Sequence, residues 1–171
     1  MKKDVGAKPD ICGKLQFEAV RRIKSLQFLL LEYLFFRDSE AGGTLPLNLP
    51  LLLSPLSLVL HIVKSRALAL LSLPCYFVKL ETKIVGLFAI QEYHESLFVA
   101  SLGVAKDYRG RGIGTCILSY IEAIARHMGK KLLEVDVLQK NVPAQRLYTK
   151  YGFTFIQNER MHCLMRGKKP L

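Results

Sequence analysis

Two groups of residues in this chain stand out by their types and spacing, and the first suits a phosphate-bearing ligand. The first is Arg109-Gly110-Arg111-Gly112-Ile113-Gly114, which follows the apolar run Leu97–Val104 and opens the amphipathic segment Gly112–Met128. Glycines let successive backbone N–H groups converge, a helix N-terminus adds a positive field, and arginines hydrogen-bond to phosphate. This segment therefore predicts an anion-binding loop between a strand and a helix.

The loop does not match the common nucleotide-binding motifs. A P-loop requires a glycine, four further residues and then Gly-Lys-Ser/Thr, and that pattern is absent. In the dinucleotide fingerprint G-x-G-x-x-G, the third glycine would fall at Thr115 or at Ile117. Glu134 lies near the spacing of a ribose-binding acid, so the dinucleotide interpretation is weakened but stays open. RNA-binding RG tracts are disordered and repetitive, and this segment is neither.

A second motif follows the strand-like run Leu132–Val137 and reads Asn141-Val-Pro-Ala144-Gln-Arg-Leu147-Tyr148-Thr-Lys-Tyr-Gly152-Phe153. Together the two motifs resemble those of the GCN5-related N-acetyltransferase (GNAT) family. The first matches the family's R/Q-x-x-G-x-G/A loop at Arg109, Gly112 and Gly114. The second matches N-x-x-A-x-x-L-Y-x-x-x-G-F at every fixed position. The resemblance covers about residues 75–157 and fades before them.

The resemblance implies an α/β, single-domain GNAT fold with a mixed, mostly antiparallel central sheet, splayed at the coenzyme site and flanked by helices. Within residues 1–171, it implies an acceptor-side part (1–74), a coenzyme-binding core (75–157), and a final strand with a basic tail (158–171). The implied reaction moves an acetyl group from acetyl-coenzyme A to a primary amine, by direct attack in a ternary complex. The acceptor would be a peptide or protein N-terminus or a small amine.

The same resemblance implies a set of coenzyme-binding residues. The backbone of the central strand would bond to the pantetheine arm, and the glycine loop would hold the pyrophosphate. On the following helix, positions i, i+3 and i+7 share one face. There the asparagine would face the arm, the alanine would leave space for it, and the tyrosine hydroxyl would meet the sulfur. The full set is Leu102, Gly103, Val104, Arg109, Gly110, Arg111, Gly112, Ile113, Gly114, Thr115, Asn141, Ala144 and Tyr148.

Two residues are the candidates for catalysis. Tyr148 is the expected general acid, by resemblance. Asp136 lies five residues before Asn141, where some N-terminal acetyltransferases of this family carry a catalytic glutamate, and it is one methylene shorter. The period of a strand places Asp136 and Glu134 on one sheet face. The alternatives are a water held by Ser101 or Tyr93, with Glu92 and Glu95 as weaker candidates, or an Asp136 that is simply an exposed strand residue.

The length, composition and net charge of the chain limit the kinds of function that it can have. The 171 residues suit one domain, half of them are hydrophobic, and the net charge of +11 suits an anionic ligand such as coenzyme A. Two other classes stay open: a non-catalytic coenzyme-binding regulatory module, and a basic protein that binds nucleic acid or membrane surfaces. We expect no nucleic-acid partner, and a homodimer is compatible with the sequence.

Cysteine usage and hydropathy suggest the compartment. The four cysteines (Cys12, Cys75, Cys116 and Cys163) form no C-x-x-C pair and have no metal-ligand spacing with histidines, so we expect no metal. Cys75 and Cys116 are expected to be buried thiols of a cytoplasmic protein, and the N-terminus lacks an apolar signal core. The leucine-rich stretch Thr44–Val63 has no charge, but three prolines argue against a membrane span and for an apolar cleft wall.

Periodicity predicts the order of elements. We expect strands at Leu15–Ile23, Tyr76–Leu80, Ile84–Gln91, Leu97–Val104, Leu132–Val137, Phe153–Gln157 and Met161–Met165. We expect helices at Ser25–Phe36, Ser57–Leu71, Gly112–Met128 and from Asn141 to Gly152. The tail Arg166-Gly-Lys-Lys-Pro is expected to be a solvated basic end.

Overall fold

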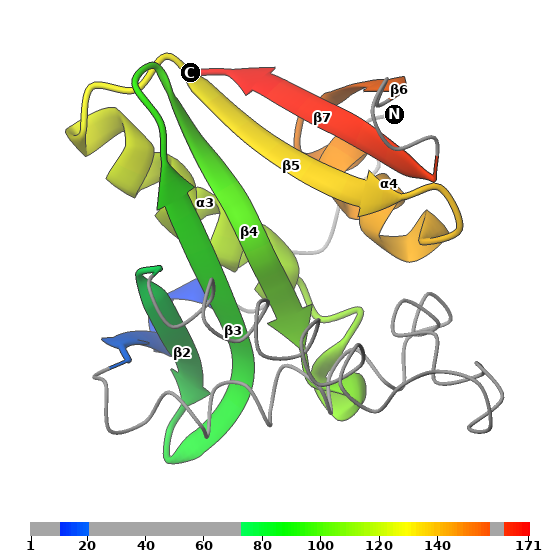
Figure 1. Cartoon of the computed structure of the whole chain (residues 1–171). Helices are drawn as coiled ribbons and strands as arrows, with labels where there is room; N and C mark the ends of the chain where they lie inside the picture. The colour runs from blue at the N-terminus through cyan, green and yellow to red at the C-terminus, as the bar shows by residue number, and fades with distance from the viewer. Residues whose placement is uncertain (1–10, 21–72, 158–162) are drawn as a thin grey trace, which may run out of the picture.

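One seven-stranded sheet organises the protein (Figure 1). The computed structural model describes residues 11–20, 73–157 and 163–171. The strand order is β1-β2-β3-β4-β5-β7-β6, and every neighbouring pair is antiparallel except β4 and β5, which are parallel. This confirms the predicted mixed, mostly antiparallel sheet. The strands are β1 (Leu15–Ala19), β2 (Cys75–Leu80), β3 (Lys83–Glu92), β4 (Ser96–Val104), β5 (Leu132–Leu138), β6 (Thr154–Gln157) and β7 (Leu164–Pro170).

Most predicted elements between residues 75 and 157 are confirmed to within a few residues. The hairpin of β2 and β3, the central strand β4 and the strand β5 lie where alternation predicted them. Strand β1 ends at Ala19, earlier than the predicted Ile23. The two helices predicted before residue 72 and the stretch Thr44–Val63 lie outside the described residues.

Two helices pack on one face of the sheet, behind the strands in Figure 1. Helix α3 (Ile113–His127) has the predicted apolar stripe, and its buried residues are Ile113, Cys116, Ile117, Leu118, Ile121 and Ala125. Helix α4 (Val142–Lys150) adds Tyr148 to the same core. Met128, the last residue of the predicted helix, follows the end of α3 and is exposed.

The prediction of a solvated basic tail is wrong. Residues 164–170 form β7, which lies between β5 and β6. Arg166 and Lys168 stand opposite the carboxylates of Asp136 and Glu134 on β5, so their charges are compensated within the sheet. Gly167 lets the strands pack closely, because a Cβ there would lie 2.7 Å from a ring carbon of Phe155.

The prediction of a free thiol at Cys116 is also wrong, since Cys12 and Cys116 form a disulfide. Their Cα atoms are 5.4 Å apart, although 104 positions separate them in the sequence. Cys12 lies in the short helix η1 (Cys12–Lys14), and Cys116 lies in the first turns of α3. Cys75 is buried and forms no disulfide, as predicted. The thiol argument for a reducing cytosol therefore loses its basis, and the cytoplasmic location stays a prediction.

Within the described ranges, no helix combines the length and the apolar character that crossing a membrane requires.

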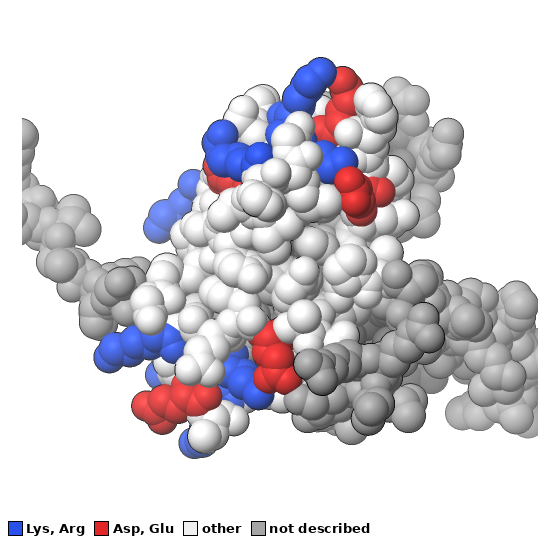
Figure 2. All heavy atoms as spheres, turned by 90° about the vertical axis from the view of Figure 1, so that its left-hand side faces the viewer, with Lys and Arg blue, Asp and Glu red and all other residues white. Residues whose placement is uncertain are grey.

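Basic and acidic side chains lie beside one another on the side of the molecule that Figure 2 shows. They gather at the two ends of this side, and uncharged residues fill the middle. Ion pairs account for several of the charged residues described: Lys130 is 2.6 Å from Glu92, Lys131 is 2.7 Å from Glu95, and Lys79 contacts Glu18. The surplus positive charge of the chain therefore does not form one continuous basic patch on this side.

Candidate functional site

The parallel strands β4 and β5 separate partway along their length. Their pairing begins at Ser96 and Leu132 and ends at Val99 and Val135, although both strands continue. On its other side, β4 has a register shift against β3, where Ala89 pairs with Ser101 and Ile90 pairs with Val99. Ala100 is therefore an extra residue, and such a bulge bends the strand that carries it. We call the divergence beyond Val99 and Val135 the fork; Figure 1 shows β4 and β5 moving apart there.

The predicted backbone contacts to a coenzyme lie along the open arm of the fork. Leu102 and Val104 are half-buried and pack toward the core beneath α3, whereas Gly103 between them is buried. All three belong to the part of β4 that has β3 on one side and no pairing with β5 on the other. The edge of β4 that faces away from β3 can therefore bond to an extended ligand, as an added strand would, although the carbonyl oxygen of Val104 already accepts from Arg109.

The glycine loop lies at the wide end of the fork, between β4 and α3. Gly110 and Gly112 have φ angles of 74° and 89°, and an added Cβ at either would meet no described residue within 4 Å. These glycines are thus required by the path of the backbone rather than by packing. The N–H groups of Ile113, Gly114 and Thr115 belong to the first turn of α3, where a helix has no internal acceptors. Such a turn can bind a phosphate.

The two arginines of the loop make contacts of their own. Arg109 donates from Nε to the carbonyl oxygen of Val104 at 2.9 Å, which ties the loop to the end of β4. The guanidinium of Arg111 lies 5.2 Å from the centre of the Tyr108 ring. These contacts hold two positive charges beside the open N–H groups.

Gly114 has a role that the sequence did not reveal. A Cβ at this position would lie 2.9 Å from Cδ2 of Leu147 on α4. The third glycine of the motif therefore permits close packing of α3 against α4 at the wide end of the fork.

Helix α4 is fixed at its N-terminus by two side chains. Asn141 caps the helix, and its Oδ1 accepts a hydrogen bond from the backbone N–H of Ala144 at 3.2 Å. Gln145, which the sequence did not single out, donates from Nε2 to the carbonyl oxygens of Leu138 (3.0 Å) and Gln139 (2.7 Å). These bonds tie the first turn of α4 to the end of β5 and so position the helix face that carries Tyr148.

Tyr148 is buried, with 6% of its surface exposed. Its ring packs edge-on against Phe153 and Phe155, with centroids 5.4 and 6.5 Å away. Burial raises the pKa of Tyr148 above its ordinary value, so its hydroxyl stays protonated. A neutral buried phenol is a hydrogen-bond donor for an anion that forms beside it.

Asp136 is the first residue of β5 beyond its pairing with β4, so it lies at the closed end of the fork. Leu133, Val135 and Val137 point into the core beneath the helices, and alternation puts Glu134 and Asp136 on the opposite face. Both carboxylate oxygens of Asp136 accept hydrogen bonds from Arg166, one from Nε and one from Nη2 at 2.8 Å. These hydrogen bonds raise the pKa of Arg166 above its ordinary value.

Glu92 and Glu95, the weaker candidates for the base, flank the turn between β3 and β4. This turn precedes the first residue of β4, whereas the wide end of the fork is at its last residue. Glu92 and Glu95 pair there with Lys130 and Lys131. Tyr93 is 47% exposed, and its ring contacts Phe98. The structure therefore brings Asp136 to the fork and leaves Glu92 and Glu95 away from it.

Two buried serines on β4 differ in their partners. Ser96 donates to Oε2 of Glu134 at 2.7 Å. Ser101 lies just beyond the bulge, and its buried Oγ has no hydrogen-bond partner in the described part of the chain. An unpartnered buried hydroxyl is costly, so this position is either strained or reserved for a partner from outside the chain.

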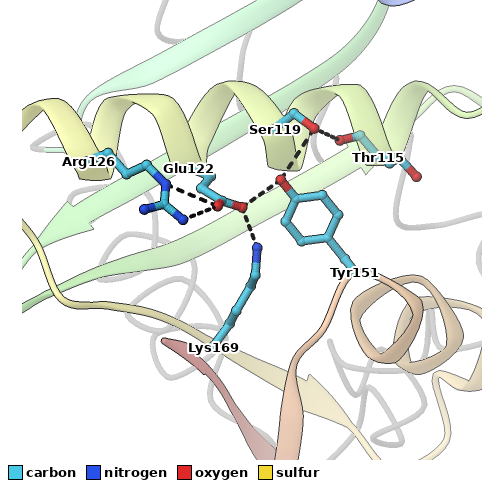
Figure 3. A network of polar contacts seen from close by, with 6 residues as sticks. All are labelled: Thr115, Ser119, Glu122, Arg126, Tyr151 and Lys169. Carbon is cyan, nitrogen blue, oxygen red and sulfur yellow. Dashed lines mark hydrogen bonds and ion pairs between the residues drawn. The ribbon is translucent and has the colours of Figure 1, made fainter. Parts of the chain in front are cut away.

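A polar network centred on Glu122 of α3 joins this helix to Tyr151, which follows α4, and to Lys169 of β7 (Figure 3). Glu122 of α3 accepts hydrogen bonds from Arg126 (2.8 Å), Tyr151 (2.8 Å) and Lys169. Burial alone would raise the pKa of Glu122, but the three donors outweigh it and lower the pKa to about 2. The network joins α3 to the end of α4 and to β7, and it was not predicted because Tyr151 and Lys169 lie 29 and 47 positions from Glu122.

Comparisons with known proteins agree with this geometry. The model of the acetyltransferase (GNAT) family matches residues 58–153. Streptothricin acetyltransferase of Streptomyces lavendulae is 32% identical over 63 residues, which make up 37% of this chain and 33% of that protein. The match thus spans about a third of the length of this curated relative.

Solved structures of low sequence identity share the fold. A PaiA N-acetyltransferase from Thermoplasma acidophilum, solved with coenzyme A, gives a TM-score of 0.71 at 11% identity, over 92% of this chain and 99% of that one. An acetyltransferase from Thermus thermophilus gives 0.65 at 20% identity, over 92% and 97%. The ribosomal-protein-S18-alanine N-acetyltransferase of Escherichia coli gives 0.63 at 15% identity, over 91% and 93%. With the matched family model, these likenesses confirm the predicted fold, and the chain belongs to the acetyltransferase (GNAT) family.

Proposed function

We propose that this protein transfers the acetyl group of acetyl-coenzyme A to a primary amine, by direct attack in a ternary complex. The observation that carries the proposal is the fork between β4 and β5, with the loop Arg109–Gly114 at its wide end. One site can thus bind a phosphate-bearing cofactor and receive its extended arm between two strands.

The coenzyme would lie along this path. The N–H groups of Ile113, Gly114 and Thr115 would bond to the pyrophosphate, and the open space over Gly110 and Gly112 accommodates it. The backbone of Leu102–Val104 would bond to the pantetheine arm, with Asn141 and Ala144 on the other side. In support, neighbours of the same fold from Thermoplasma acidophilum and Elizabethkingia anophelis were solved with coenzyme A and acetyl-coenzyme A.

The acetyl transfer needs a neutral amine and a stabilised leaving group. The amine nitrogen forms a bond to the thioester carbon, the C–S bond breaks, and the nitrogen gives up a proton. A cysteine thiol has an ordinary pKa of about 8.5 and a tyrosine one of about 10, so a departing thiolate has little tendency to take a proton from a tyrosine. Tyr148, whose pKa is raised further, would therefore stabilise the sulfur mainly by donating a hydrogen bond. Holding the thioester and the amine together removes much of the entropic barrier.

Asp136 is the base that we propose. Its position at the closed end of the fork supports this role, because the thioester of an arm bound along β4 would end there. Both of its oxygens accept hydrogen bonds from Arg166, so a water bound at its edge would relay the proton from the amine.

The acceptor can be sought among two kinds of amine. A relative is named for streptothricin, and a neighbour for the alanine of ribosomal protein S18. We therefore suggest assaying release of coenzyme thiol with streptothricin, peptides with a free α-amine and simple primary amines. Thiol release that depends on an acceptor, with an acetylated product found by mass spectrometry, is the expected result.

Two other outcomes would replace this proposal. Binding of acetyl-coenzyme A without turnover of any acceptor would make the protein a coenzyme-binding module. Salt-dependent binding to nucleic acid or anionic vesicles, without binding of acetyl-coenzyme A, would make it a basic surface-binding protein.

A further inference from the structure

Arg166 holds a fixed guanidinium at the closed end of the fork. It extends from β7 across β5 and lies 5.3 Å from the ring centre of Phe98 on β4. Two hydrogen bonds to Asp136 set its plane, and the aromatic ring supports one face of it. An exposed arginine side chain usually samples many rotamers. Here the contacts with Phe98 on β4 and Asp136 on β5 restrict the side chain of Arg166.

The fixed guanidinium has donors that its neighbours do not use. An arginine carries five N–H donors, and Asp136 engages one on Nε and one on Nη2. Nη1 lies 3.9 Å from a carboxylate oxygen of Glu134, which is beyond hydrogen-bond distance. About a third of the Arg166 side chain is exposed, at 33%. Within the described residues, Nη1 therefore presents open donors on the sheet face opposite α3 and α4.

This face is the one from which an acceptor can reach the thioester. The coenzyme loop belongs to α3, which packs on the other face, so the arm would enter the fork from the helix side. An acceptor amine must then approach from the face that carries Phe98, Asp136 and Arg166. The open donors of Arg166 would lie beside the atoms attached to the reacting nitrogen.

We propose that Arg166 selects acceptors that carry a carbonyl or carboxylate oxygen next to the reacting amine, as an α-amino group does. The inference rests on the proposed acetyl transfer and names the class of its acceptor. The carbonyl or carboxylate oxygen of such an acceptor would accept a hydrogen bond from Nη1 of Arg166, while its amine nitrogen faces the fork. A simple alkylamine offers no such oxygen and would leave these donors without a partner in a partly closed site.

Lys168 provides a matched control. It lies two residues further along β7 on the same face, and it too carries a positive charge toward Glu134, at 3.6 Å. It stands opposite Glu134, before the fork begins, whereas Arg166 stands opposite Asp136. Removing its charge changes the electrostatics of the face but not the donors at the fork.

The test compares two acceptors in each variant. Alaninamide and isopropylamine both present an amine on a branched carbon, but only alaninamide has the neighbouring carbonyl. Only the neutral amine reacts, and an α-amine ionises at about pH 7.7–8.0 against about 10.4 for an alkylamine, so each rate is expressed per concentration of neutral amine. On that scale we expect wild type to favour alaninamide in kcat/KM by about tenfold or more, mainly through KM. Arg166→Lys, which keeps the charge but not the planar fork of donors, and Arg166→Met should both abolish the preference. Lys168→Met should keep it.

The ratio of the two acceptors separates recognition from damage to the fold, because a misfolded fraction lowers both rates alike. Equal use of both acceptors by wild type would overturn the inference while leaving acetyl transfer intact. A preference that survives in both Arg166 variants, or that is lost equally in Lys168→Met, would also overturn it. If wild type released no thiol with any acceptor, the proposed function itself would fail.

Discussion

Asp136 and Arg166 face each other across β5 and β7, joined by two hydrogen bonds at the point where β5 leaves β4. This pair places a carboxylate and a guanidinium at the closed end of the fork. The carboxylate can accept a proton, and the guanidinium can hold an oxygen. The pair therefore joins the candidate base to the residue proposed to recognise the acceptor.

The Asp136→Asn substitution separates the two roles of the carboxylate. If Asp136 takes the proton, kcat should fall by about 10²–10⁴-fold and the acidic limb of the pH–rate profile should disappear. Affinity for acetyl-coenzyme A, measured by calorimetry, should not change. A variant that keeps its kcat and its pH profile but loses acceptor affinity would show that Asp136 only positions Arg166.

Tyr148→Phe removes one hydroxyl from a buried ring that packs against Phe153 and Phe155. We expect kcat to fall by about tenfold to 10²-fold, with little change in the KM for acetyl-coenzyme A. The effect should be modest, because a thiolate is already a fairly good leaving group. Steady-state kinetics over a range of pH would test this, and undiminished turnover would reduce Tyr148 to a packing residue.

The Glu122 network should make stability depend on acidic pH. The pKa of Glu122 is lowered from 4.5 to about 2 in the folded protein. Its contribution is therefore complete above pH 4.5 and is lost as the pH falls from there toward 2. Glu122→Gln should remove about 1–2 kcal/mol of unfolding free energy near pH 7, after allowance for solvent screening, and much less near pH 2.

Glu95→Gln is the control for that measurement. Glu95 also forms an ion pair, with Lys131, but both groups are exposed at the end of the β3–β4 hairpin. Urea unfolding at several pH values should show little change for this variant. Equal losses in the two variants would contradict the central position given to Glu122.

The two buried serines of β4 should respond oppositely to alanine. Ser96→Ala removes a hydrogen bond to Glu134 and should lower the unfolding free energy by about 1–2 kcal/mol. Ser101→Ala removes a hydroxyl without a partner in the described residues, so stability should be unchanged or higher. Thermal unfolding would measure both, and a clear loss in Ser101→Ala would reveal a bound water or another partner.

The sequence predicted the elements whose signals are local. The periodicity of α3, the alternation in β2–β5 and the cap at Asn141 all depend on neighbouring residues, and each is confirmed. The motifs also predicted that the strands would part beside the glycine loop, because the family resemblance carries that feature.

Features that depend on distant partners were missed. The basic residues of β7 looked solvated because Asp136, the partner of Arg166, lies 30 positions away. The disulfide joins residues 104 positions apart, and no spacing rule relates them. The packing role of Gly114 depends on Leu147 of the next helix, which only the folded arrangement brings within reach.

Calorimetric titration of acetyl-coenzyme A into Gly112→Asp and Gly129→Asp tests the central claim most directly. These two glycines bracket α3, both have positive φ (89° and 68°), and an added Cβ at either meets nothing within 4 Å. Backbone strain is therefore similar in both, but only Gly112→Asp puts a negative charge beside the open N–H groups of the loop. We predict that Gly112→Asp loses most of its affinity and its thiol release, while Gly129→Asp keeps both. Wild-type affinity in a folded Gly112→Asp protein would contradict a coenzyme site at the wide end of the fork.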